Sequence, residues 1–269
     1  METEKTKHLL IELPGLEFDE PTHTYTYLGQ LLPGVTTITG VRQKEFLKWW
    51  TVKMAVEYLK EKQDEIKKAT PEQFLDILGE AKRAHVRSAD TAKDYGKEAH
   101  EWIEVYIKSR ILDRDMTGEI PQADEVLNAI NAFLGWERAH EVRWLASEVV
   151  IASVKHQFAG TLDALAEVDG KLSLVDFKTS NQIGDDYFLQ TAGYQIALEE
   201  LGVIPEQRII VRIPKSGADC EAMVVPTPFE FDKETFLHCR EVHRWNVYIK
   251  NHIADERGMI KVAKEKSSE

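Results

Sequence analysis

Short runs of alternating and β-branched apolar residues occupy the middle of the chain and predict three consecutive strands, at 142–153, 158–168 and 171–178. Asp169 and Gly170 separate the second run from the third, and an Asp-Gly pair at this spacing predicts a two-residue hairpin turn. The second and third strands are therefore expected to pair antiparallel.

Helical patterns lie on both sides of these strands. Residues 43–111 contain almost no Gly or Pro and predict a helical region broken at Thr70-Pro71, where the proline suits the first position of a new helix. Residues 23–38 are rich in Tyr, Thr and Val and predict a small hairpin. Further helices are predicted at 121–140, 186–201 and 229–253, and further strands at 208–213 and 220–225.

The order of these elements predicts the fold class. From residue 121 onward the order is helix, three strands, helix, one or two strands and helix, which is typical of a mixed α/β sheet flanked by helices. We expect an N-terminal hairpin and helical lobe over 1–118, an α/β core over 119–255 and a frayed tail over 256–269. These parts are expected to form one compact unit.

Charge and composition exclude several classes of protein. The net charge of −12 argues against binding nucleic acid through bulk positive charge, but the stretch 42–98, with thirteen basic and eleven acidic residues, is slightly basic. Two cysteines cannot build a four-cysteine metal site or a disulfide framework, and they favour a reducing compartment. No apolar run is long enough for a membrane span and the N-terminus lacks a secretory pattern, so a cytoplasmic location is expected.

The candidate chemistry lies on the last two of the three central strands. Because side chains alternate along a strand, Asp176 and Lys178 share one face, and Phe177 points to the other. Asp163 lies six residues before Asp169 and Asp176 six after Gly170, so the two carboxylates are expected to face each other. Facing carboxylates repel, and a cation between them would relieve this, with Mg²⁺ or Mn²⁺ favoured by oxygen ligands. The alternative is a surface hairpin with an exposed ion pair, which the apolar flanking residues disfavour.

These motifs resemble those of a known family. The sequence GTLD at 160–163, VDFKTS at 175–180, and Gln190 with Tyr194 resemble the PD-(D/E)XK nuclease superfamily, in particular its RecB-type and phage-type exonuclease branch. The Gly-x-x-x-His spacing at 96–100 and the segment LLPGVTTI at 31–38 also fit this branch. The resemblance covers about residues 23–225 and implies a restriction-endonuclease-like core.

The resemblance also implies roles for individual residues. Asp163, Asp176 and the main-chain carbonyl of Phe177 would bind a divalent metal, and His100 would be a further ligand that favours Mn²⁺ alongside Mg²⁺. Lys178 would position or help to deprotonate the attacking water and stabilise the developing charge. Gln190 and Tyr194, one helical turn apart, would touch the site or the DNA backbone.

Other residues have two interpretations each. Gly96 either leaves room for a phosphate or the sheet or makes a helix-packing contact. Glu148 either lines the site or takes an edge or solvent-facing position. Trp49 would stack on unpaired bases or divide between core and surface. Contacts with DNA are also assigned to Lys97, Thr179 and Ser180, and a solvated, mixed-charge surface is the alternative for Lys97.

We therefore expect a metal-dependent DNA exonuclease of the phage type that acts in recombination, repair or DNA processing. The alternatives are a structure-specific endonuclease on the same fold and a non-catalytic DNA-binding module. The chain has no GxxxxGK[ST] motif and no cysteine cluster, so neither a bound nucleotide nor an iron–sulfur cluster is expected. DNA is the expected partner, and analogy alone suggests a single-strand annealing protein and a homo-oligomer.

Overall fold

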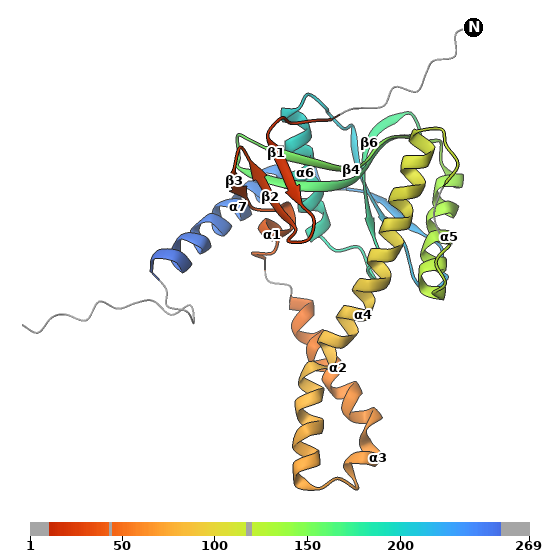
Figure 1. Cartoon of the computed structure of the whole chain (residues 1–269), viewed down its shortest axis with the longest axis vertical. Coiled ribbons are helices and arrows are strands. Elements are labelled where there is room, and N and C mark those ends of the chain that lie inside the picture. The colour runs from red at the N-terminus through yellow and green to blue at the C-terminus, as the bar shows by residue number, and fades with distance from the viewer. Residues whose placement is uncertain (1–10, 43–44, 117–119, 254–269) are drawn as a thin grey trace, which may run out of the picture.

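The computed structural model describes residues 11–42, 45–116 and 120–253 and contains two β-sheets with helices around them (Figure 1). The larger sheet has five strands in the order β4–β5–β6–β7–β8. Only the β6–β7 pair is parallel. Its strands are β4 (Val142–Ser153), β5 (Phe158–Val168), β6 (Lys171–Lys178), β7 (Gln207–Arg212) and β8 (Glu221–Val224).

The three central strands have the bounds that the sequence predicts, and β5 and β6 pair antiparallel across the predicted hairpin. Asp169 and Gly170 both adopt positive φ, +50° and +78°, as a type I′ turn requires. The pairing of Val168 with Lys171 and of Ala164 with Val175 then sets the register of the whole hairpin.

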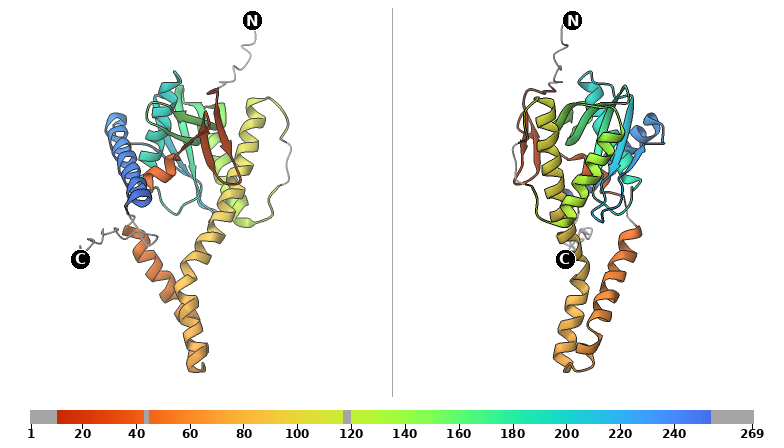
Figure 2. Two further views of the ribbon diagram at one scale, coloured as in Figure 1. Left: turned by 60° about the vertical axis from the view of Figure 1, so that its left-hand side comes forward. Right: turned by 90° about the vertical axis from the view of Figure 1, so that its right-hand side faces the viewer.

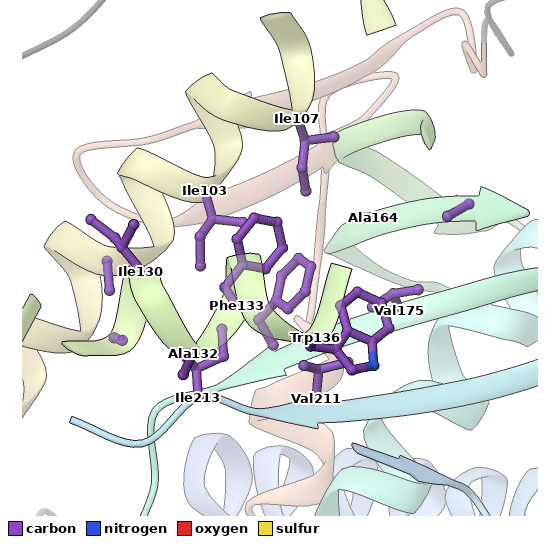
Figure 3. Packing of buried hydrophobic residues seen from close by; sticks show 14 of the residues in the cluster. Ile103, Ile107, Ile130, Ala132, Phe133, Trp136, Ala164, Val175, Val211 and Ile213 are labelled. Atoms are coloured by element: carbon purple, nitrogen blue, oxygen red, sulfur yellow. The ribbon is translucent and has the colours of Figure 1, made fainter. Parts of the chain in front are cut away.

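Helices cover both faces of this sheet. One face packs against α5 (Asp124–Ala139) and the C-terminal part of α4 (Pro71–Ile111), through a cluster that includes Ile103, Ile107, Phe133 and Trp136 (Figure 3). The other face packs against α6 (Asp186–Glu200) and α7 (Phe229–His252). The predicted mixed α/β sheet flanked by helices is thus confirmed.

The N-terminal region differs in part from its prediction. Residues 23–38 do contain a hairpin, β2 (Thr24–Tyr27) and β3 (Gln30–Leu32), but β1 (Leu16–Asp19) joins it to make a three-stranded sheet. The prediction that the hairpin continues in extended conformation to residue 38 was wrong, because Val35–Thr39 form the helix α1. Val35 and Ile38 are three residues apart and both are buried against α6 and α7, so helical packing overrides their β propensity.

A helical arm projects from the core (Figures 1 and 2). It consists of α2 (Glu45–Glu61), the short α3 (Gln63–Ile66) and the N-terminal part of α4. The predicted break at Thr70-Pro71 is confirmed: Thr70 accepts a hydrogen bond from the Gln73 N–H, and the Gln73 side chain accepts one from the Thr70 N–H. From Pro71 the helix runs without interruption for 41 residues into the core.

Two further predictions concern regions outside the described residues. The expected boundary at 118–119 and the expected frayed tail at 256–269 both fall there. Among the helices that the structure describes, none combines the length and the apolar character needed to cross a lipid bilayer.

Candidate active site

Four polar side chains from α4, β5 and β6 gather on the central sheet. Lys178 Nζ lies 2.5 Å from Asp176 Oδ2, and His100 Nδ1 lies 4.0 Å from Asp163 Oδ2. The Phe177 N–H donates a hydrogen bond of 2.7 Å to Asp163 Oδ2. The side chain of Asp176 is fully buried and that of Lys178 is 16% exposed, so this is a desolvated group of charges rather than a surface ion pair.

The hairpin register explains why the two carboxylates meet. The ladder between β5 and β6 ends at Ala164 and Val175, so Asp163 and Asp176 are the next residues outward on each strand. Beyond this point the strands make no further ladder pairs, and the Phe177 N–H turns to the Asp163 carboxylate instead. The site therefore lies where the two strands separate.

Burial dominates the electrostatics of the site. It raises the pKa of Asp176, and the neighbouring Asp163 raises it further, while the ammonium of Lys178 opposes both effects. Burial also raises the pKa of Asp163. For Lys178, burial alone would lower the pKa, but the carboxylates of Asp176 and Asp163 outweigh burial and raise it. The group thus holds two carboxyls that are costly to ionise together and one lysine that keeps its proton.

His100 is uncharged at neutral pH. Burial lowers its pKa to about 4, and the nearby Lys178 ammonium contributes to the same shift. A neutral imidazole is the form that binds metal ions. The ring also lies edge-on to Phe177, at 6.4 Å between centroids, so α4 places His100 directly over the end of β6.

Gln190 and Tyr194 approach the carboxylates from α6. Gln190 Nε2 lies 3.4 Å from Asp176 Oδ1 and donates a shorter hydrogen bond, 2.9 Å, to Tyr194 Oη. Gly160 on β5 makes this approach feasible, because a Cβ there would lie 2.7 Å from Tyr194 Cε1. The amide of Gln190 is thereby fixed between the buried tyrosine and Asp176.

Glu148 lies beside the site on β4. It falls between the cross-strand pairs Ser147–Ala164 and Val149–Leu162, which places it opposite Asp163. Its φ of +50° is unusual for a non-glycine residue in a strand. Burial raises the pKa of Glu148 to about 8, and Asp163 adds to the shift. Of its two interpretations, the geometry favours a position lining the site.

Gly96 is explained by packing. A Cβ at this position would lie 2.6 Å from Thr179 Oγ1, so the missing side chain lets α4 approach the end of β6. Thr179 is therefore a packing partner of α4. This contact fits the interpretation that Gly96 leaves room for the sheet, since Thr179 directly follows β6.

The remaining DNA-contact candidates are Trp49, Lys97 and Ser180. Trp49 lies on α2 in the arm, with 76% of its surface exposed. Lys97 is exposed and forms an ion pair with Glu101 at 3.3 Å. The Ser180 hydroxyl donates a hydrogen bond to the Gln182 carbonyl.

Two tyrosines near the site were not predicted from the sequence. Lys178 Nζ lies 5.0 Å from the ring centroid of Tyr187, a cation–π contact. Tyr187 precedes Gln190 by three residues and Tyr194 by seven, so helical periodicity could have revealed it. The buried Tyr25 hydroxyl lies 3.1 Å from Thr161 Oγ1 on β5, a long-range contact that no local pattern signals.

The donor set fits a divalent cation in its chemistry. Asp176 Oδ2 has no hydrogen-bond partner of regular geometry although it is buried, and Asp163 and Asp176 are oxygen donors that repel each other. Among the described residues, however, no three His, Cys, Asp or Glu side chains are already close enough together to form a metal site. Lys178 instead occupies the position next to Asp176.

The chain belongs to the PD-(D/E)XK nuclease superfamily, since the profile of that family matches residues 74–254. Among solved structures, an alkaline exonuclease from Laribacter hongkongensis is similar at 14% identity and a TM-score of 0.31, over 57% of this chain and 91% of that chain. The same exonuclease in complex with dAMP is similar at 17% identity and a TM-score of 0.27, over 56% and 84% of the two chains. No curated protein matches the sequence.

Proposed function

We propose that this protein is a divalent-metal-dependent deoxyribonuclease that digests DNA from its ends, in recombination, repair or related DNA processing. The observation that carries the proposal is the buried group of Asp163, Asp176 and Lys178 at the point where β5 and β6 separate. Membership of a nuclease superfamily supports phosphodiester hydrolysis as the reaction. A single-strand annealing partner and a homo-oligomer remain predictions by analogy.

Asp163, Asp176, the Phe177 carbonyl and His100 are the residues that we expect to hold Mg²⁺ or Mn²⁺. When bound, the ion supplies Lewis acidity at the phosphate and lowers the pKa of water. Both carboxyls have pKa values raised by burial, so a cation between them favours the ionised forms. His100 needs no deprotonation, because its pKa is already about 4.

Lys178 acts in this proposal as a cation that positions water and stabilises charge. Its pKa is raised by Asp176 and Asp163 despite burial, so the side chain holds its proton at neutral pH. A protonated lysine cannot accept a proton from the attacking water, but it can donate a hydrogen bond to it and to the phosphate oxygen that gains charge. This favours charge stabilisation over the general-base role among the two that the sequence suggests.

Gln190 and Tyr194 serve as positioning residues. Gln190 contacts Asp176 Oδ1 through the same amide nitrogen that it shares with Tyr194, so α6 fixes the orientation of the carboxylate. Glu148, opposite Asp163, completes the acidic lining, and Asp163 adds to the rise of the Glu148 pKa.

The test is digestion of DNA by the full chain in the presence of Mg²⁺ or Mn²⁺, with EDTA as the metal-free condition. Lys178→Ala is expected to remove nearly all activity, while Lys171→Ala, at the exposed start of the same strand, is expected to cut like the wild type. Linear DNA should be digested and a covalently closed circle left intact. Full activity of Lys178→Ala, or activity in EDTA, would refute the proposed mechanism, and cleavage of the circle would identify an endonuclease.

A further inference from the structure

A groove of about 710 Å³ runs beside the candidate active site. Its walls are the N-terminal segment 11–18, the C-terminal end of α4 and residues 145–150 of β4. Within the described sheet, β4 pairs only with β5, so its other edge is open toward this groove. β1 packs against β4. A volume of this size can accommodate a nucleoside-sized ligand.

The lining of the groove combines apolar side chains with polar and titratable groups. Leu16, Phe18, Ile111 and Leu145 are among its apolar side chains. Its titratable residues are Glu12, Glu148 and Lys108, and Lys108 forms an ion pair with Glu104. Since Lys108 is already paired with Glu104 and the described residues that line the groove include no other cation, the groove is unsuited to a phosphate and suited to an uncharged, flat apolar group.

Glu148 connects the groove to the candidate active site. It lines the groove and also lies opposite Asp163 on the neighbouring strand. A ligand that touches Glu148 in the groove therefore lies next to Asp163, one of the two carboxylates at the proposed cleavage site.

Phe18 provides a rigid aromatic wall. Its ring stacks on Tyr25, with centroids 4.7 Å apart and 23° between the planes, while it also lines the groove. Tyr25 is itself buried and held to Thr161 of β5 through its hydroxyl. The aromatic pair is thus fixed to the strand that carries Asp163, and a planar group entering the groove would extend the stack.

We propose that this groove binds the nucleobase of a nucleotide adjoining the cleaved bond, with its phosphate directed toward Asp163 and Asp176. The inference rests on the proposed nuclease function and adds to it a subsite contributed by the N-terminal sheet, outside the region that matches the family profile. Stacking on Phe18 and contact with the apolar side chains do not distinguish one base from another, so we expect the groove to accept all four bases.

The experiment uses oligonucleotides in which a stable abasic analogue replaces one nucleotide at a time near the cleaved bond. For the wild type, one position is expected to lower the single-turnover rate by about 5-fold to 150-fold, the range for loss of one base–aromatic contact. We call this fold-decrease in rate the abasic penalty. Phe18→Leu keeps an apolar side chain but removes the ring, so the abasic penalty measured with this variant should be much smaller than with the wild type. Leu112→Trp narrows the groove from the exposed end of α4 and should reduce the penalty as well.

Leu75→Trp is the matched control, because it makes the same change at an exposed position of α4 in the arm. It should leave the penalty at its wild-type value. Thermal unfolding of each variant checks that the fold is intact. An equal abasic penalty in the wild type, Phe18→Leu and Leu112→Trp, or the absence of any sensitive position, would overturn the groove proposal.

Failure of the nuclease proposal has a different signature, namely no cleavage of unmodified DNA with either ion. In that case the affinities of the abasic and unmodified oligonucleotides, measured by fluorescence anisotropy, are compared, and the loss of affinity at one position is the abasic penalty. If one abasic position weakens binding to the wild type but not to Phe18→Leu, the result supports binding of a base in the groove. Equal affinities for all the oligonucleotides would refute it.

Discussion

The buried ion pair between Arg208 and Asp232 gives a stability prediction that follows directly from the structure. Arg208 Nη2 lies 2.8 Å from Asp232 Oδ2, and the two side chains are only 4% and 5% exposed. Arg208 Nη1 also donates to the Phe188 carbonyl on α6. One guanidinium therefore ties β7 to both α6 and α7.

Asp232→Ala removes the carboxylate and leaves the guanidinium buried without its counter-charge. Removal of one partner of such a pair costs about 3–5 kcal/mol. In a chain of this size that loss corresponds to a fall in Tm of roughly 6–20 °C. The carbonyls of Phe188 and Thr227 keep two of the Arg208 hydrogen bonds, so we expect the lower half of this range.

The assay is thermal and urea unfolding of both this variant and a matched control. Glu167→Ala breaks the exposed pair between Arg143 and Glu167 on β4 and β5 and should cost less than about 1 kcal/mol. The double variant Arg208→Met with Asp232→Leu, which leaves no unpaired charge, should be more stable than Asp232→Ala alone. If Asp232→Ala costs no more than Glu167→Ala, the assignment of this pair as a buried structural link is wrong.

Three smaller predictions concern the arm, the core and the cysteines. Thr70→Ala removes the N-terminal cap of α4 and should cost about 1 kcal/mol in urea unfolding, with faster amide exchange over the first turn; unchanged exchange would contradict the capping role. Phe133→Ala leaves a cavity at a fully buried position that contacts Phe177 and should lower the free energy of unfolding by about 3–5 kcal/mol. A loss below about 1 kcal/mol would contradict this role of Phe133 in the core. Burial raises the pKa of Cys220 to about 12 and that of Cys239 above its usual value, so both thiols should react slowly with a thiol reagent at pH 8 and rapidly once unfolded; fast reaction of the native chain would show that they are accessible thiolates.

The central sheet could be predicted because its signals are local. The strand bounds at 142–153, 158–168 and 171–178 follow from short apolar runs and from one Asp-Gly turn, and the hairpin register follows from counting outward from that turn. The N-terminal region could not be predicted in the same way. The β-branched residues of Val35–Thr39 favour a strand locally, and only their packing against helices from the far end of the chain makes them helical.

The same distinction applies to the candidate site. The expected meeting of Asp163, Asp176 and Lys178 depends on one hairpin, and these residues do lie together. The contact of His100 with this group depended on the family resemblance, since nothing local relates α4 to β5. The packing of Gly96 on Thr179 and the contact of Tyr25 with Thr161 depend on tertiary placement alone.

The length of α4 has a mechanical consequence. The helix carries His100 in its last third, where residues such as Ile103 and Ile107 clamp it to the sheet, and its first turns form the tip of the arm. At 1.5 Å per residue the tip lies about 45 Å from His100. Because α4 is held at its packed C-terminal part, a rotation of the helix by about 5° about that part moves the tip by about 4 Å and hardly displaces His100. The tip of the arm can therefore be displaced by several ångströms while the spacing between His100 and the carboxylates stays constant.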